Sequence, residues 1–252
     1  MAVDVGGLTE KRVSPASSDK LEIHVESLDT MEYDAINVVD FDIEQLQRLA
    51  YRPGRLAFVS ANLNHPELLS TPAKRWVVTE RGGKKIGITG VFLPEHEAFS
   101  NATLALEEVL GELRDVVDVM VVLAYGPQAQ VGELVQKYPD IDIAVSNSHS
   151  VPDSEISWIG DNQALLAPVS KGTWLVGLDV DMARGVDVST TKSIKVDLGD
   201  SIADDKSIRE LIDQRTREQY QARNLKVTTD VGETFLNLSP EEFMRQKAGG
   251  IQ

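Results

Sequence analysis

The stretch Tyr33-Asp34-Ala35-Ile36-Asn37-Val38-Val39-Asp40-Phe41-Asp42 decides the fold of this chain. Residues 36–39 are mainly apolar and predict a short buried strand. A helix is predicted over 42–51, because Ile43, Leu46 and Leu49 recur at helical spacing on one face. Asp40 and Asp42 flank Phe41 at this strand-to-helix junction, where aspartate is a favoured helix cap.

Apolar runs and amphipathic helices alternate along the rest of the chain. Further helices are expected over 103–113, 131–137 and 204–223, and the run 116–124 is apolar enough for a central strand covered on both faces. This alternation predicts an α/β protein in which two stacked sheets are flanked by helices. The remaining strands are predicted at 56–61, 76–80, 85–92, 141–145, 164–169, 174–180 and 193–198.

Two glycines beside two lysines, in Arg81-Gly82-Gly83-Lys84-Lys85, raise the question of a phosphate-binding loop. The spacing does not fit the Walker pattern, and no helix follows. The segment is instead typical of a hairpin turn between the strands at 76–80 and 85–92.

Composition limits the possible functions. The chain has 252 residues, 42% of them hydrophobic, so it can bury a large core. Its net charge of −15 argues against binding of nucleic acid, which requires clustered lysine and arginine. It has no cysteine, which excludes disulfides and thiolate metal sites. No apolar run approaches the ~20 residues needed to cross a bilayer, so no membrane insertion is expected.

The domain organisation is expected to be simple. Residues 1–20 are polar and turn-rich, which predicts a flexible N-terminal arm. Residues 21–224 are expected to form one core, and 225–252 a C-terminal tail with a short helix at Pro240–Lys247.

Several phrases, in their order along the chain, resemble calcineurin-like metallophosphoesterases of the 5'-nucleotidase and thiosulfohydrolase branch. The opening stretch is similar to a family segment in which Tyr-Asp-Ala precedes a strand and then Gly-Asn-His-Glu. The resemblance runs from Gly6 to Arg223 and implies a four-layer α/β/β/α sandwich. The other matching phrases are Gly6-Gly7-Leu8, Phe58 to Leu63, Lys84 to Gly90, Asp118 to Gly126, Ile141 to Ser150 and Gly172 to Val180.

In that family, two divalent metals held by Asp, Asn and His clamp a phosphoryl group and supply a metal-bound hydroxide. The resemblance implies that most of these ligands are missing here. Asp40 stands at the position of the metal-binding Asn, Phe41 at that of the catalytic His, and Tyr125 at that of another His. The bridging Gly-Asp has only a faint echo in Leu28-Asp29. The opening Asp-x-His is expected to lie before Gly6, where the chain begins too late to include it.

The relic of this cleft is expected at the carboxyl ends of the strands, where ligands bind in open α/β sheets. Its candidate residues are Asp40, Asp42, Tyr125, Asn147 and His149. Four of them have a plainer interpretation: helix capping for the two aspartates, a packed turn for Tyr125, and a solvated loop for His149. No catalytic residue, metal ligand or cofactor is predicted.

The resemblance thus predicts a non-catalytic scaffold or partner-binding protein on a degenerate metallophosphoesterase core, with another protein or subunit as its partner. One alternative is a metal-dependent hydrolase of phosphate or sulfur esters whose site is unconventional or completed by a partner. Another is a small-molecule or anion-binding module. The family implies a periplasmic or extracellular location if a leader was removed, and otherwise the protein is expected in the cytoplasm; no signal peptide is visible.

Overall fold

The computed structural model of the chain describes residues 1–9, 15–147, 156–167 and 174–236. The chain divides into two compact units, Met1–Asp204 and Asp205–Gln252. The first holds every sheet, and the second holds the helix α5 (Lys206–Leu236).

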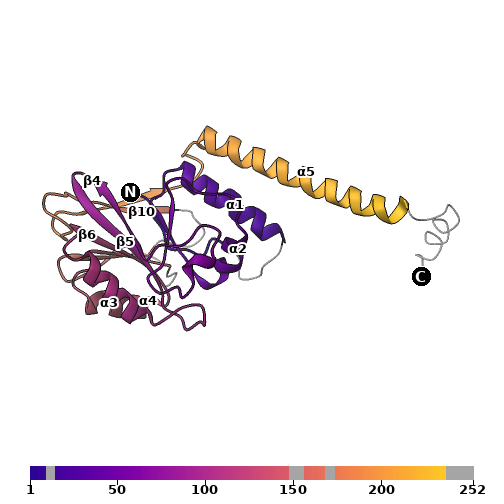
Figure 1. Ribbon diagram of the computed structural model, residues 1–252. Helices are drawn as coiled ribbons and strands as arrows, with labels where there is room; N and C mark the ends of the chain where they lie inside the picture. Colours follow the sequence, from indigo (N-terminus) through magenta and orange to yellow (C-terminus); the bar gives the residue numbers. More distant parts are fainter. Residues whose placement is uncertain (10–14, 148–155, 168–173, 237–252) are drawn as a thin grey trace. The chain divides into compact units, whose positions relative to one another are not determined.

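A six-stranded sheet forms the centre of the first unit (Figure 1). Its four inner strands are parallel, and the strand at each edge is antiparallel to its neighbour. In spatial order the strands are β4 (Trp76–Arg81), β5 (Lys84–Phe92), β6 (Val119–Tyr125), β7 (Ile143–Ser146), β9 (Gln163–Leu166) and β8 (Ile156–Ile159).

The hairpin between β4 and β5 is as predicted. Arg81 pairs with Lys84, and the two residues between them, Gly82 and Gly83, have φ angles of 58° and 74°. Two successive residues in the left-handed region make a turn whose twist matches that of the strands, and glycine adopts this region without steric cost.

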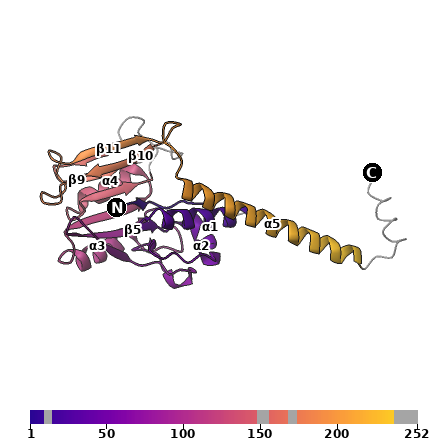
Figure 2. The same ribbon diagram turned by 90° about the horizontal axis from the view of Figure 1, so that it is seen from above.

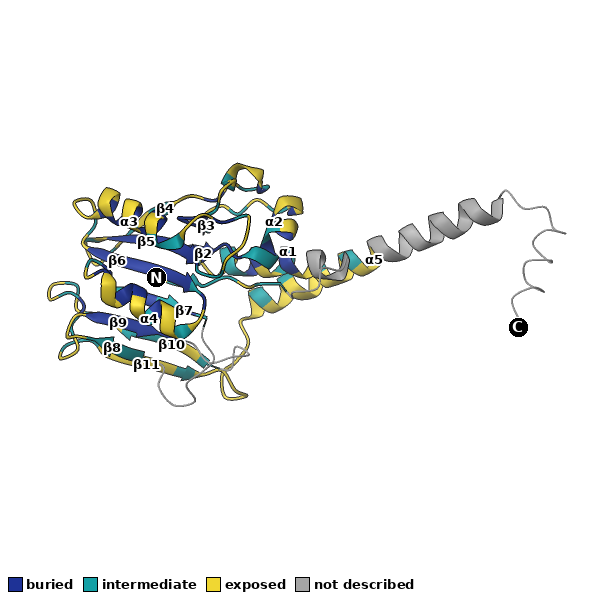
Figure 3. Ribbon diagram, turned by 90° about the horizontal axis from the view of Figure 1, so that it is seen from below, coloured by how far each residue is buried: buried dark blue, intermediate teal, exposed yellow. Residues whose placement is uncertain are grey.

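One face of this sheet is covered by helices α3 (Ala102–Leu113) and α4 (Gln128–Lys137) (Figure 1). Leu106 and Val109 of α3 and Val131 of α4 are buried in a cluster with Met120 and Val122 of β6. Strands β5 and β6 are buried along most of their length (Figure 3). This pattern confirms the prediction of a central strand covered on both faces.

The opposite face packs against a second layer of strands. This layer contains a parallel sheet of β1 (Val3–Asp4), β2 (Ala35–Asn37) and β3 (Ala57–Val59). It also contains an antiparallel hairpin of β10 (Trp174–Asp179) and β11 (Lys192–Asp197), seen in Figure 2. Ala35, Val59 and Val176 from this layer share one apolar cluster with Ile88 and Val121 from the six-stranded sheet.

A fourth layer covers the far side of the three-stranded sheet. Successive side chains of a strand point to opposite faces, so Ile36 points away from Ala35. Ile36 and Phe58 pack there against Leu21 and Val25 of α1 (Pro15–Thr30) and Leu46 of α2 (Ile43–Arg48). The order helix, sheet, sheet, helix confirms the predicted α/β/β/α sandwich. Two short 3-10 turns, η1 (Asp40–Asp42) and η2 (Pro66–Leu68), complete this region.

The ends of the chain differ from the expectation. A flexible arm is predicted over residues 1–20, but Val3–Asp4 pairs with β2 and the first helix already begins at Pro15. The expected core ends at 224, whereas the first unit ends at Asp204 and α5 extends to Leu236. The helix expected at 240–247 lies outside the described residues.

No helix in the described part of the chain is long and apolar enough to cross a membrane.

Candidate functional site

The carboxyl ends of strands from both sheets meet at one place. Asp40 and Asp42 follow β2, Tyr125 ends β6, and Asn147 follows β7. The ring of Phe41 packs edge-on against that of Tyr125, with centroids 5.8 Å apart. Of the five candidates, the structure therefore brings Asp40, Asp42, Tyr125 and Asn147 together. His149 lies outside the described residues.

Tyr125 ends a strand of the six-stranded sheet, and its hydroxyl is affected by the charges of two aspartates that follow the three-stranded sheet. Burial raises the pKa of its hydroxyl, and the charges of Asp40 and Asp42 raise it further, while a hydrogen bond with the Asn147 side chain opposes the rise. Asn147 Oδ1 also accepts a hydrogen bond of 2.8 Å from the Gly126 N–H. Tyr125 is therefore a neutral phenol at physiological pH, which is a poor ligand for a divalent cation.

An aromatic cluster fills the space between the loops. Phe92 stacks on Tyr125 at 5.7 Å between centroids and lies 4.5 Å from Phe99. Phe41 closes the cluster, and Val39 is buried against it. Phe41 and Tyr125, the two rings that stand where the resemblance places histidines, contact each other within this cluster, so the cleft has an apolar interior at this point.

Asp42 has a different role from the predicted one. It makes no side-chain cap on α2. Its carboxylate instead accepts hydrogen bonds from the backbone N–H groups of Gly7 (2.9 Å), Leu8 (3.3 Å) and Thr9 (3.0 Å), and from Thr9 Oγ1 (2.8 Å). Burial raises the pKa of Asp42, and these four donors oppose the rise. The side chain fastens the segment after β1 to the β2–α2 junction.

Asp40 is the less satisfied of the two aspartates. Its Oδ1 atom is buried and has no hydrogen-bond partner among the described residues. A buried carboxylate oxygen without a partner costs free energy, so a water molecule or a cation would be favourable beside it. The described residues nevertheless contain no group of three or more His, Asp or Glu side chains placed to hold a metal ion.

The structure also shows a residue that the sequence reasoning missed. Asp4 lies at the carboxyl end of the first strand, and burial raises its pKa against the effects of the Gly6 N–H and His24. Its neighbour Gly6 donates its backbone N–H to Asp4 Oδ1 at 2.8 Å, so this carboxylate lies close to the segment that Asp42 binds.

Leu28-Asp29, the segment that weakly resembles the family's bridging Gly-Asp, has a structural role. Asp29 lies near the end of α1, not in a strand. Its carboxylate accepts hydrogen bonds from the N–H groups of Gly54, Arg55 and Leu56 and from the Tyr51 hydroxyl. These bonds hold the loop that leads into β3, away from the aromatic cluster.

No protein-family model and no curated protein sequence matches this chain. Solved structures do match. A 5'-nucleotidase precursor from Thermus thermophilus is 15% identical with a TM-score of 0.64, and the match covers 79% of this chain and 46% of that one. The sulfate thiohydrolase SoxB from Thermus thermophilus is 14% identical with a TM-score of 0.63, covering 87% of this chain and 43% of its own.

The NAD nucleotidase of Haemophilus influenzae is 14% identical with a TM-score of 0.57, covering 76% of this chain and 47% of its own. The chain thus spans less than half the length of each of these proteins. Identities this low show the fold alone. The fold is of the metallophosphoesterase type, as the sequence resemblance predicts.

Proposed function

We propose that this chain, whose fold is of the metallophosphoesterase type, is a non-catalytic scaffold or partner-binding protein. The observation that carries the proposal is the aromatic cluster of Phe41, Phe92, Phe99 and Tyr125 at the carboxyl ends of the strands. Hydrolysis by a two-metal site needs several Asp, Asn and His ligands around a hydrated space. Packed aromatic rings fill that region here.

The ligand set supports the same proposal. Asp4 and Asp40 are carboxylates at the right ends of their strands, but Gly6 and Phe41 have no ligating atom in their side chains. Asp42 is fully engaged by the backbone of Gly7–Thr9. The described residues contain no group of three or more His, Asp or Glu side chains placed to hold a metal ion.

The negative charge of the site also supports a non-catalytic role. The acidic groups near Tyr125, namely Asp40 and Asp42, act on it as negative charges. The described residues around them offer no cationic side chain that pairs with either. A phosphate or sulfate ester would be repelled from such a site unless a cation offset the field.

The test is metal content measured together with ester hydrolysis. The purified chain is analysed for Mn, Zn and Fe by mass spectrometry, then assayed with 5'-nucleotides, NAD and an S-sulfonate ester, with and without added Mn²⁺. We expect substoichiometric metal and rates at the uncatalysed background. The Thermus thermophilus 5'-nucleotidase, assayed in parallel, controls for the conditions.

Stoichiometric metal with turnover would overturn the proposal and favour the metal-dependent hydrolase. Turnover that appears only after a partner protein is added would favour a site completed by that partner. The variant F41A is put through the same metal analysis and hydrolysis assay as a matched check. Loss of this ring perturbs the aromatic cluster, but it removes no catalytic group if the proposal is right.

A further inference from the structure

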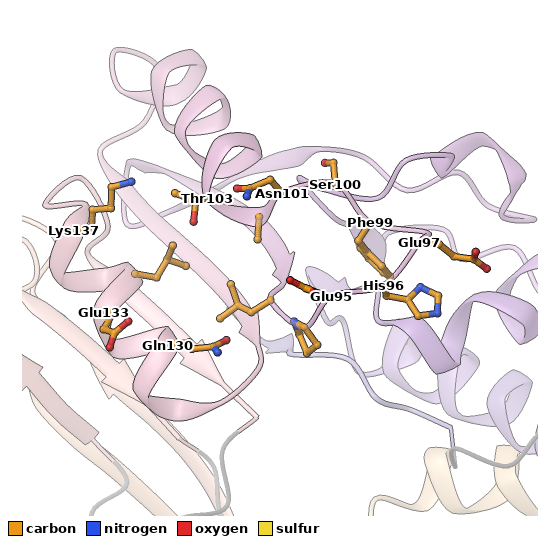
Figure 4. Close-up of a pocket in the computed structure, with 14 residues that line it drawn as sticks. Glu95, His96, Glu97, Phe99, Ser100, Asn101, Thr103, Gln130, Glu133 and Lys137 are labelled. Carbon is orange, nitrogen blue, oxygen red and sulfur yellow. The ribbon is translucent and has the colours of Figure 1, made fainter.

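A groove of about 980 Å³ lies beside the aromatic cluster, on the helical face of the six-stranded sheet. One wall is the loop from β5 to α3 and the first turn of α3, and the other wall is α4 (Figure 4). Phe99, which belongs to the aromatic cluster, also lines the groove, so the two features are continuous. This volume is within the range of sites that take small ligands or short chain segments.

Three carboxylates line the groove without an ion-pair partner among the described residues. Glu95 and Glu97 come from the loop and Glu133 from α4, and all three are exposed (Figure 4). None makes an ion pair or side-chain hydrogen bond within the described part of the chain. The groove therefore presents acidic groups from both of its walls.

The one lysine in the lining is engaged elsewhere. Lys137 Nζ lies 4.8 Å from the centre of the Tyr138 ring. Its pKa is raised by a hydrogen bond to Tyr138 and by the charges of Tyr138 and Glu107. It lies one helical turn from Glu133, yet the two form no ion pair. The negative charge of the groove consequently remains available to a ligand.

Several acidic side chains on nearby surfaces are paired, unlike those of the groove. Arg75 binds both Glu108 and Glu112 of α3 at 2.9 and 2.6 Å. Lys84 binds Asp118 at 2.8 Å.

The base of the groove is apolar. Leu134 and Phe99 are 6% and 8% exposed, and Leu93 is half-buried between them and the loop. Gln130 lines the same wall as Glu133 and offers an amide that can bond to a backbone (Figure 4). The groove therefore combines an acidic rim, an apolar base and a polar amide.

We propose that this groove docks an extended segment of a partner protein in which lysine or arginine alternates with apolar residues. The cationic side chains lie against Glu95, Glu97 and Glu133, and the apolar ones contact Leu93 and Leu134. Side chains of an extended segment alternate in direction, which matches an acidic rim above an apolar base. The inference rests on the proposed function and names the chemistry of the partner.

Charge along the chain favours a cationic partner. Residues 205–252 contain equal numbers of acidic and basic residues, so the whole net charge of −15 lies in Met1–Asp204, the unit that contains the groove. A field of one sign accelerates the approach of an oppositely charged partner and weakens with salt.

The test uses the full chain and a short synthetic peptide of alternating lysine and leucine, capped at both ends. Binding is followed by calorimetry and by amide chemical shifts. We expect shifts at 93–103 and 130–137, and about tenfold weaker binding to the variant E95Q/E133Q, the size expected for two exposed ion pairs. The control E80Q/D115N removes the same charge outside the groove and should change the dissociation constant less than twofold.

Equal weakening by both double variants would overturn the proposal, because it would show attraction to general acidity. Equal binding of spermine, or of a peptide of lysine and serine, would show a polyamine or cation site in place of a docking groove. No binding of the lysine–leucine peptide would also overturn it. None of these readouts involves metal or ester hydrolysis, so failure here is separable from failure of the proposed function.

Discussion

Asp42 shows how one side chain organises the candidate site. We expect Asp42→Ala to lower the free energy of unfolding by about 2–3 kcal/mol, because the N–H groups of Gly7 and Thr9 would lose a charged acceptor in a buried place. Urea unfolding would measure the loss. Glu44→Ala is the control: its ion pair with Arg48 is exposed, and its removal should cost at most about 0.5 kcal/mol.

Formate provides a sharper version of this test. The alanine variant leaves room for a small carboxylate beside the three N–H donors, so formate should stabilise Asp42→Ala in a saturable manner and leave the parent chain unchanged. Equal stabilisation of both proteins, or a loss in the variant no larger than that of Glu44→Ala, would contradict the assigned role.

Asp142 gives a pH-dependent prediction. Burial raises its pKa, as does the charge of Asp140, while the Met120 N–H opposes the rise. A carboxyl with a raised pKa in the folded state binds protons more readily there than in the unfolded chain. Its favourable contribution to stability is therefore present at acid pH and is lost as pH rises through its folded pKa.

The variant Asp142→Asn should accordingly be as stable as the parent or more so at pH 7, because an amide oxygen can still accept from the Met120 N–H. This advantage should shrink as pH falls toward about 4. Thermal unfolding across that range would show it. Asp142→Ala loses the acceptor as well, so it should be less stable than Asp142→Asn at every pH; the opposite order would refute the assignment.

Sequence reasoning identifies Asp40, Asp42, Tyr125 and Asn147 as residues at strand ends, and the structure places them together. It does not reveal what Asp42 binds, because the donors lie 33–35 residues earlier in the chain. Helix capping is a local rule, and a local rule cannot show that a side chain bonds to a distant loop. Asp4 is missed for a related reason: a strand of two residues has no readable periodicity.

Two glycines offer a contrast at the level of elements. Gly6 has a φ of +87°, and a Cβ there would lie 2.4 Å from the Asn37 carbonyl oxygen. Gly6→Ala should therefore destabilise the fold by about 2–4 kcal/mol through strain and crowding at the end of β1. Gly132 lies within α4, and no atom lies within 4 Å of the place that a methyl group would take there. Gly132→Ala should therefore stabilise the fold by about 0.5–1 kcal/mol.

Chemical denaturation of the two alanine variants in parallel would check this pair. Similar effects of both substitutions would mean that the backbone after β1 is not held in the left-handed region.

Element types follow well from the sequence, and boundaries less well. The strands β5, β6 and β7 are long or strongly apolar runs, which periodicity detects. Helix α1 begins at Pro15, in a polar stretch that predicts part of an arm, because large apolar residues of the helix appear only from Leu21 onward. Tertiary packing of Leu21 and Val25 stabilises this helix beyond what its first turn suggests.

At the scale of the whole molecule, the buried apolar residues among the side chains that the structure describes all belong to the first unit, the last being Val186. The fragment 1–204 should therefore fold alone, with a Tm within about 4 °C of that of the full chain, which corresponds to about 1 kcal/mol for a protein of this size. Calorimetry of both would decide. A fragment that melts much earlier would show that residues after Asp204 stabilise the first unit.

The hydrogen bonds between Asp42 and Gly7–Thr9 also determine the order in which parts of the chain can become fixed during synthesis. The donors leave the ribosome more than thirty residues before their acceptor does. The first strand consequently cannot be fastened in its final place while only α1 has emerged. It must wait for β2 and the turn that follows it, so the first strand is among the last parts of its neighbourhood to become fixed, although it is made before them.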